Sequence, residues 1–124
     1  MLIDSHVALW WLANDDRLGV SCRSVVQTAS EVYFSPVTPW ELGIKKALGK
    51  IDFPDGLPEA LVGAGFVELP IRSVHTELAA TLPHHHRDPF DRLLVAQALL
   101  ESLQLVTADV SIEPYEVTVL DPRR

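Results

Sequence analysis

Four carboxylates stand at positions from which a folded chain could bring them together. Asp4 directly follows an apolar run at residues 1–3, and Asp109 follows a second apolar run at residues 105–107. Glu41 and Asp91 lie near the starts of two stretches with helical periodicity. Mg²⁺ and Mn²⁺ prefer such oxygen ligands, and one or two ions can activate a water for attack on a phosphodiester. The four acids therefore indicate divalent-cation binding and phosphodiester hydrolysis.

Each acid also has a simpler, structural interpretation. Asp4 can be the N-cap of the helix that follows it, and Asp91 can be a capping acid in the first turn of its own helix. Glu41 and Lys45 form an i,i+4 pair, which is usually a solvated surface ion pair. Asp109 can punctuate a turn. These interpretations stay open individually, but four of them at one edge of one sheet are a less economical explanation than a common site.

The elements that must position the acids alternate along the chain. We predict strands at 1–3, 32–34, 66–69, 105–107 and 117–120, and helices after Asp4, at 21–30, 38–48, near Leu61, at 73–82 and at 89–103. Such alternation favours a parallel sheet covered by helices on both faces, a three-layer α/β domain. Ligands bind beyond the carboxyl ends of such strands, where Asp4 and Asp109 are expected.

Local signals place the two helical acids. Thr38 and Pro39 predict an N-cap and a first-turn proline, which puts Glu41 in the first turn of a helix that ends at Gly49. The residues three, four and seven places after Asp91 are apolar and form a stripe that faces the core. Asp91 therefore points inward or along the rim, where its carboxylate needs a compensating partner.

Composition limits the class of protein. A chain of 124 residues with 48% hydrophobic residues predicts a single domain, residues 1–124, with a proper core. The net charge of −7 argues against a broad basic surface for duplex DNA but not against a nuclease with a carboxylate pocket. The single cysteine, Cys22, excludes an internal disulfide. With no basic leader and no span long enough for a bilayer, we expect a cytoplasmic protein.

Other residues near the acids receive supporting or neutral roles. Lys45 and Arg92, the basic neighbours of Glu41 and Asp91, are expected to support the site, with Lys45 guiding phosphate. The run His84–His85–His86 cannot direct three imidazoles at one ion and is predicted to be a solvated loop. Trp10 and Trp11 point about 100° apart on a helix, which predicts one in the core and one at a dimer or partner-protein interface, with base stacking by either ring as a third, less favoured interpretation.

Four stretches carry a resemblance to a known family. In chain order they read LIDSHVALWWL, SPVTPWELGIKKALGKIDFP, HHHRDPFDRLLVAQAL and LQLVTAD. With these stretches the sequence resembles the PIN-domain ribonucleases, and specifically the VapC-like toxins of bacterial and archaeal toxin–antitoxin pairs. The resemblance extends over nearly the whole chain.

The resemblance implies a three-layer α/β/α fold around a short parallel sheet, with an acidic pocket that binds Mg²⁺ or Mn²⁺ and cuts RNA. The family's acids correspond to four residues here: Asp4, Glu41, Asp91 and Asp109. Two hydroxyl positions near the pocket correspond to Ser5 and Thr107. In the DPFD stretch, Asp88 is expected to cap the helix while Asp91 binds the metal.

The family pattern also implies partners. It suggests a homodimer and a cognate antitoxin whose C-terminal segment covers the pocket, often with an arginine directed at the carboxylates. A guanidinium binds carboxylates through two hydrogen bonds and competes with metal. DNA is expected to be contacted only through the antitoxin, and no membrane partner is expected.

Two alternatives remain open. The first is a non-toxin, metal-dependent phosphoryl-transfer enzyme with the same fold, although no second Asp stands two residues after Asp4, as a phosphoaspartate phosphatase would need. The second is a non-catalytic, partner-binding PIN-like module with a degenerate pocket. The presence of all four acids disfavours it.

Overall fold

A five-stranded parallel sheet lies at the centre of the computed structural model, which describes residues 1–84 and 88–124. Every pair of neighbouring strands is parallel. In spatial order the strands are β3 (Val67–Glu68), β2 (Tyr33–Phe34), β1 (Leu2–Ile3), β4 (Leu105–Val106) and β5 (Val119–Leu120). The predicted short parallel sheet is confirmed, and β1 is its central strand.

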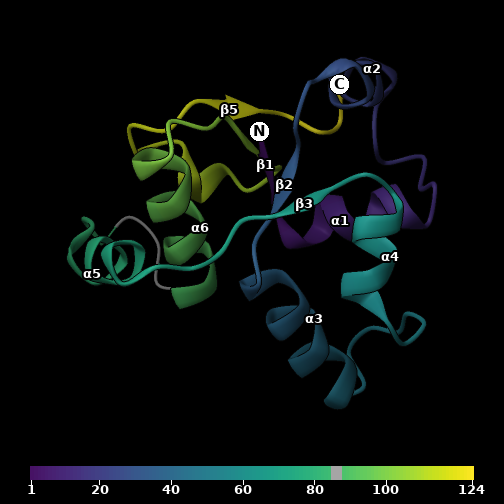
Figure 1. Cartoon of the computed structure of the whole chain (residues 1–124), viewed down its shortest axis with the longest axis horizontal. Helices are drawn as coiled ribbons and strands as arrows, with labels where there is room; N and C mark the ends of the chain where they lie inside the picture. The colour runs from purple at the N-terminus through teal and green to yellow at the C-terminus, as the bar shows by residue number, and fades with distance from the viewer. Residues whose placement is uncertain (85–87) are drawn as a thin grey trace.

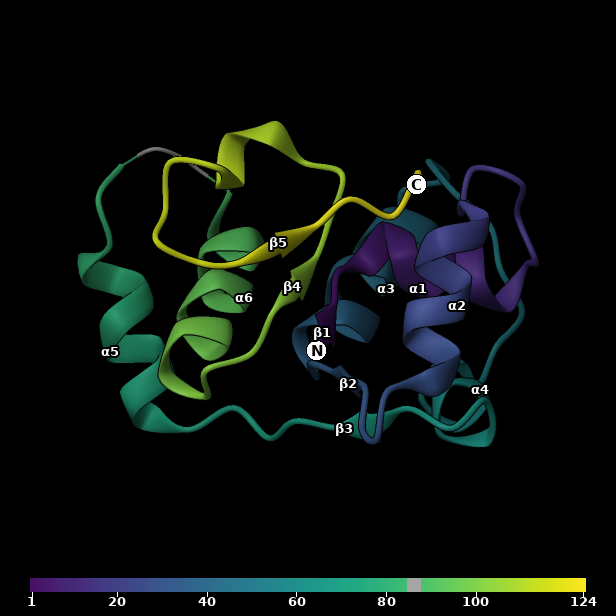
Figure 2. The same ribbon diagram turned by 90° about the horizontal axis from the view of Figure 1, so that it is seen from above.

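Helices cover both faces of this sheet. On one side lie α1 (Ser5–Leu12), α2 (Val20–Thr28) and α4 (Leu57–Gly63), and on the other lie α5 (Ser73–Thr81) and α6 (Pro89–Leu100) (Figures 1 and 2). The remaining helix, α3 (Val37–Ala47), packs against both α1 and α6. The three-layer α/β/α architecture is therefore confirmed. None of these helices in the described residues has the length and apolar character needed to cross a bilayer.

The two-residue strands divide the core into two parts because successive strand side chains point to opposite faces. Leu2 and Leu105 are fully buried in the core beneath α5 and α6. Their neighbours Ile3 and Val106 are equally buried in the core beneath α1, α2 and α4. Both central strands are thus apolar on both faces, as a covered parallel sheet requires.

The start of α3 differs from the prediction. The helix begins at Val37, and the hydroxyl of Ser35 accepts from the Val37 amide at 3.1 Å. The side chain of Thr38 is buried within the first turn and does not cap the helix. At the other end, Gly49 adopts the left-handed conformation with φ of 72° and terminates the helix as predicted.

One short element was not predicted from the sequence, and one predicted loop lies partly outside the described residues. A short 3₁₀ turn, η1 (Val110–Ile112), follows β4 and was not predicted. Of the predicted histidine loop, His85 and His86 lie outside the described residues. At the far end of the chain, the carbonyl oxygen of Arg124 accepts from the Cys22 amide at 2.9 Å, which attaches the tail to the start of α2.

Candidate functional site

An acidic pocket of about 440 Å³ opens beyond the carboxyl ends of β1 and β4. All four acids identified in the sequence line this pocket, together with a fifth carboxylate, Asp88, and residues of α1 and α3. The residues that line it are Asp4, Ser5, His6, Val7, Trp10, Glu41, Lys45, Asp88, Asp91, Ala108 and Asp109. The structure therefore confirms the predicted position of these acids: residues far apart in the sequence lie together at this edge of the sheet.

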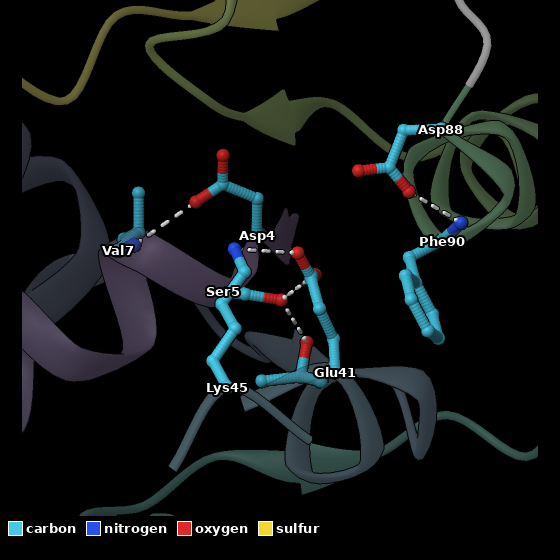
Figure 3. A network of polar contacts seen from close by, with 8 residues as sticks. Asp4, Ser5, Val7, Glu41, Lys45, Asp88 and Phe90 are labelled. Carbon is cyan, nitrogen blue, oxygen red and sulfur yellow. Dashed lines mark hydrogen bonds and ion pairs between the residues drawn. The ribbon is translucent and has the colours of Figure 1, made fainter. Parts of the chain in front are cut away.

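Asp4 is both a helix cap and a member of the pocket. One carboxylate oxygen accepts from the Val7 amide at 2.9 Å (Figure 3). The other accepts from the Thr107 hydroxyl at 2.6 Å. The residue is only 6% exposed. Burial raises the pKa of Asp4 above its usual value, and the hydrogen bonds from Thr107 and Val7 oppose the rise only in part. The capping interpretation and the site interpretation are thus compatible.

Glu41 is buried beside Asp4 in a polar network. Its carboxylate accepts from the Ser5 hydroxyl at 2.7 Å and from the Lys45 ammonium at 3.1 Å (Figure 3). The Thr38 hydroxyl lies 3.4 Å from that of Ser5. Glu41 is 5% exposed, so the alternative interpretation of Glu41 and Lys45 as a solvated surface pair does not hold. It is also wrong that Glu41 lies in the first turn, because α3 begins earlier than predicted.

The acids at the start of α6 and after β4 serve helix ends as well. Asp88 is the N-cap of α6, where it accepts from the Phe90 amide at 2.9 Å (Figure 3), and Asp91 lies in the first turn, both as predicted. Asp109 caps η1 by accepting from the Ser111 amide at 2.9 Å. Asp91 and Asp109 are half-buried, in contrast to Asp4 and Glu41.

Arg92 has a structural role instead of the predicted role in the site. It is 8% exposed, and its guanidinium donates to the carbonyl oxygens of Ala79, Leu82 and Pro83 at 2.8 to 3.1 Å. These bonds satisfy carbonyls at the end of α5, where a cation is favoured. The next residue after Asp91 on a helix points about 100° away from it, which explains the error.

Two pocket residues were missed as members of the site. His6 and Trp10 line it from α1, two and six residues after Asp4. His6 and Trp10 are four residues apart, and residues at i and i+4 share a helix face. Because His6 also follows Asp4 by only two residues, this spacing is the signal that could have identified both as pocket residues.

The donor set suits a hard divalent cation, although the side chains are not arranged as a finished ligand sphere. Carboxylate and hydroxyl oxygens are the donors that Mg²⁺ and Mn²⁺ prefer. Within residues 1–84 and 88–124, no three His, Cys, Asp or Glu side chains are placed so that they could hold one metal ion together. The buried carboxylates instead bind Thr107, Ser5 and Lys45. The residues fit the ion in type: the Lys45 ammonium is the cation that a bound metal would replace at Glu41, whereas Thr107 and Ser5 already orient the two buried carboxylates.

Comparisons with known proteins agree with this architecture. The family model described as PIN domain matches residues 1–116. The chain is 28% identical over 130 residues to Ribonuclease VapC22 of Mycobacterium tuberculosis (strain ATCC 25618 / H37Rv), covering 96% of this chain and 97% of that protein.

Two solved structures share the fold. A chain in the structure of VapBC2 from Rickettsia felis bound to a DNA fragment from their promoter superposes with a TM-score of 0.70 at 11% identity, covering 96% of both chains. A chain in the structure of FitAB bound to an IR36 DNA fragment gives a TM-score of 0.70 at 19% identity, covering 99% of this chain and 95% of the other.

Proposed function

Because this chain belongs to the PIN-domain family, we propose that residues 1–124 form a single catalytic domain, an endoribonuclease that depends on Mg²⁺ or Mn²⁺ and acts as the toxin of a type II toxin–antitoxin pair. One observation carries the proposal: acids from four separate parts of the chain, Asp4, Glu41, Asp91 and Asp109, line one pocket. The similarity to a ribonuclease over 96% of the chain supports RNA as the substrate.

The four acids would hold the cation directly or through water. When bound, the ion supplies positive charge that activates a water and stabilises the negative charge developing on the phosphodiester. Thr107 fixes one oxygen of Asp4, and Ser5 fixes one oxygen of Glu41, so both carboxylates are oriented by hydroxyl donors. Lys45 compensates Glu41 in the present arrangement and would release it to the ion, becoming available to a phosphate.

Cleavage of total cellular RNA by the purified protein tests the proposal. The wild type is incubated with Mn²⁺, Mg²⁺ or EDTA beside Asp4→Asn and Asp91→Asn, with Asp16→Asn as a control for an exposed acid outside the pocket. We expect cleavage only with metal, its loss in the two pocket variants and its retention in the control. Metal-independent cleavage, or equal activity in all variants, would refute the assignment.

A second assay separates the enzymatic alternative. A metal-dependent phosphoryl-transfer enzyme of another kind should hydrolyse a small phosphomonoester, whereas the ribonuclease is expected to leave it intact. A folded protein that binds Mn²⁺ and cleaves neither substrate would favour the non-catalytic, partner-binding alternative.

The proposal extends to protein partners. Ribonuclease VapC22, VapBC2 and FitAB support a cognate antitoxin, with DNA contacted through that partner, and the toxin itself is proposed to be a homodimer. Co-expression with a small neighbouring open reading frame should relieve growth arrest caused by the wild type. Arrest that persists in Asp91→Asn would not come from RNA cleavage.

A further inference from the structure

An aromatic wall stands beside the carboxylates of the acidic pocket. His6 and Trp10 lie one turn apart on α1, and their ring centroids are 6.4 Å apart with the planes tilted by 51°. Both line the acidic pocket, and both also line a second, mainly apolar cavity of about 820 Å³ whose other lining residues include Leu9, Ile51 and Phe53. The two rings therefore form the ridge between the acids and a neighbouring groove.

A cation lies over the Trp10 ring. The guanidinium carbon of Arg17 lies 5.1 Å from the centre of the Trp10 ring. Asp15 in turn binds this guanidinium through two hydrogen bonds of 2.7 and 3.1 Å. The hydrogen bonds from Arg17 lower the pKa of Asp15 to about 2, so the pair stays ionised at neutral pH. Such support suits a rigid platform, because a ring that is already ordered loses little entropy when a ligand stacks on it.

The cations around this ridge are already engaged by carboxylates. Lys45 pairs with Glu41 at 3.1 Å, Lys46 pairs with Asp55 at 2.9 Å, and Arg17 pairs with Asp15 at 2.7 Å. Their charge is largely compensated in a chain whose net charge is −7. Affinity for RNA through phosphate contacts depends on uncompensated Lys and Arg, which release counterions on binding. In this arrangement, with Lys45 still bound to Glu41, the described part of the site offers little uncompensated positive charge to RNA phosphates.

We propose that Trp10, with His6 beside it, is the stacking platform for an unpaired nucleobase next to the phosphodiester that is cut. The inference rests on the proposed ribonuclease function and names its substrate as single-stranded or looped RNA, whose bases are free to stack. Aromatic stacking binds every base through its π-face and does not require a net positive protein. The bound metal and the stacked base would then hold the two sides of one nucleotide linkage.

Binding of short RNA to a non-cleaving protein tests this platform. In the Asp91→Asn background, the probes are a fluorescent single-stranded RNA of about eight nucleotides, an abasic oligomer of equal charge and an RNA duplex. Trp10→Phe keeps a flat ring, Trp10→Leu keeps apolar volume without one, and His6→Ala removes the exposed neighbour. Trp40→Leu is the matched control, since Trp40 is 62% exposed on α3 and does not line the pocket. Melting temperatures establish that each variant folds.

The expected results separate stacking from charge. Trp10→Leu should weaken RNA binding by about 10-fold to 100-fold, Trp10→Phe by much less, and Trp40→Leu should leave it unchanged. RNA should quench tryptophan fluorescence in the Trp40→Leu protein but not in Trp10→Phe. The abasic oligomer and the duplex should bind weakly. The dissociation constant should depend on salt with a logarithmic slope of about 1 to 1.5, which corresponds to roughly two phosphates.

Three outcomes would overturn the inference. Equal binding of the abasic oligomer would show that phosphates dominate, and a folded Trp10→Leu protein with unchanged affinity would show that the ring is not used. Quenching of Trp10 by a basic, apolar peptide without any response to RNA would assign the ridge to a protein partner. If Trp10→Leu does not fold, the RNA affinity of His6→Ala and the affinity for the abasic oligomer still test the inference. Metal-dependent cleavage by the wild type alongside any of these results would leave the proposed function intact.

Discussion

The acidic pocket holds its carboxylates in two different ways. The buried pair, Asp4 and Glu41, is about 95% shielded from solvent. It accepts from the Thr107 and Ser5 hydroxyls of distant segments and, within α3, from the Lys45 ammonium. The half-buried pair, Asp91 and Asp109, lies at helix ends, where acids are common. A helix end explains the half-buried pair adequately, but it does not explain why the chain buries two acids side by side. The buried pair is therefore the stronger sign of selection for chemistry.

The largest expected effect tests whether the two pairs act as one site. Asp4→Asn, Glu41→Gln and Asp91→Asn should each lower the rate of RNA cleavage by about a hundredfold or more, because each removes a charge that binds the cation. Single-turnover cleavage rates at saturating Mn²⁺ provide the measurement. Loss of activity confined to the buried pair would separate the pairs and reduce Asp91 to a cap.

The next effect concerns the donors that orient the buried pair. Thr107→Val removes the hydroxyl that binds Asp4, and Ser5→Ala removes the one that binds Glu41. Each should lower Mn²⁺ affinity or cleavage by about 10-fold to 100-fold, as for other groups that position ligands. Titration of Mn²⁺ against cleavage rate measures both. The exposed Thr76→Val serves as control, and equal losses there would indicate general destabilisation.

A smaller effect, with the opposite sign, concerns stability. Burial raises the pKa of Asp4, so the folded protein binds a proton there more tightly than the unfolded chain, whose carboxyl has a pKa near 3.8. The ionised group therefore destabilises the fold at neutral pH, and this cost disappears as the pH falls below the folded pKa. In EDTA at pH 7, Asp4→Asn should therefore have a higher melting temperature than the wild type.

The same melting experiment contains its own check. The advantage of Asp4→Asn should shrink as the buffer is acidified, and added Mn²⁺ should stabilise the wild type but not the variant. A variant that melts below the wild type in EDTA at every pH would mean that the Thr107 bond outweighs the burial cost. Asp109→Asn, which can retain the cap on η1, should change the melting temperature little.

The smallest effect lies outside the pocket, at an exposed ion pair. The hydrogen bonds from Arg17 lower the pKa of Asp15 to about 2, so its ionised form stabilises the fold above the unfolded pKa of 3.8 and loses this effect as the pH falls through about 2. Asp15→Asn should therefore lower the melting temperature slightly at pH 7 and not at all near pH 2. The pair is exposed, which keeps the effect small.

The sequence predicted the sheet, the layers and the positions of the four acids because those depend on local apolar patterns. Asp4 and Asp109 follow their strands, and the stripe behind Asp91 is buried as expected. The contacts of the acids could not be predicted from the sequence, because they join segments that are far apart in the chain. The bond from Thr107 to Asp4 spans 103 residues, and the one from Ser5 to Glu41 spans 36.

Errors in the prediction have local causes. Thr38 carried a plausible capping signal, but the hydroxyl of Ser35, three residues earlier, accepts from the amide of Val37, the first residue of α3. The helix therefore begins earlier than predicted, and Glu41 lies beyond its first turn. An i,i+4 acid–base pair looks the same in a sequence whether it is exposed or buried, so the burial of Glu41 required the packed structure. Arg92 likewise gave no sequence sign that the carbonyls of α5 would surround its guanidinium.

The central position of β1 has a consequence for synthesis of the protein. β1 pairs with β2 and with β4, and β4 lies about a hundred residues later in the chain. Long-range parallel pairing forms slowly, and domains emerge at only about 5 to 20 residues per second. Asp4 therefore waits for Thr107 and Asp109 before the pocket exists. The nascent chain cannot assemble its acidic site until β4 and Asp109 have been translated, so the activity proposed here would be delayed until then.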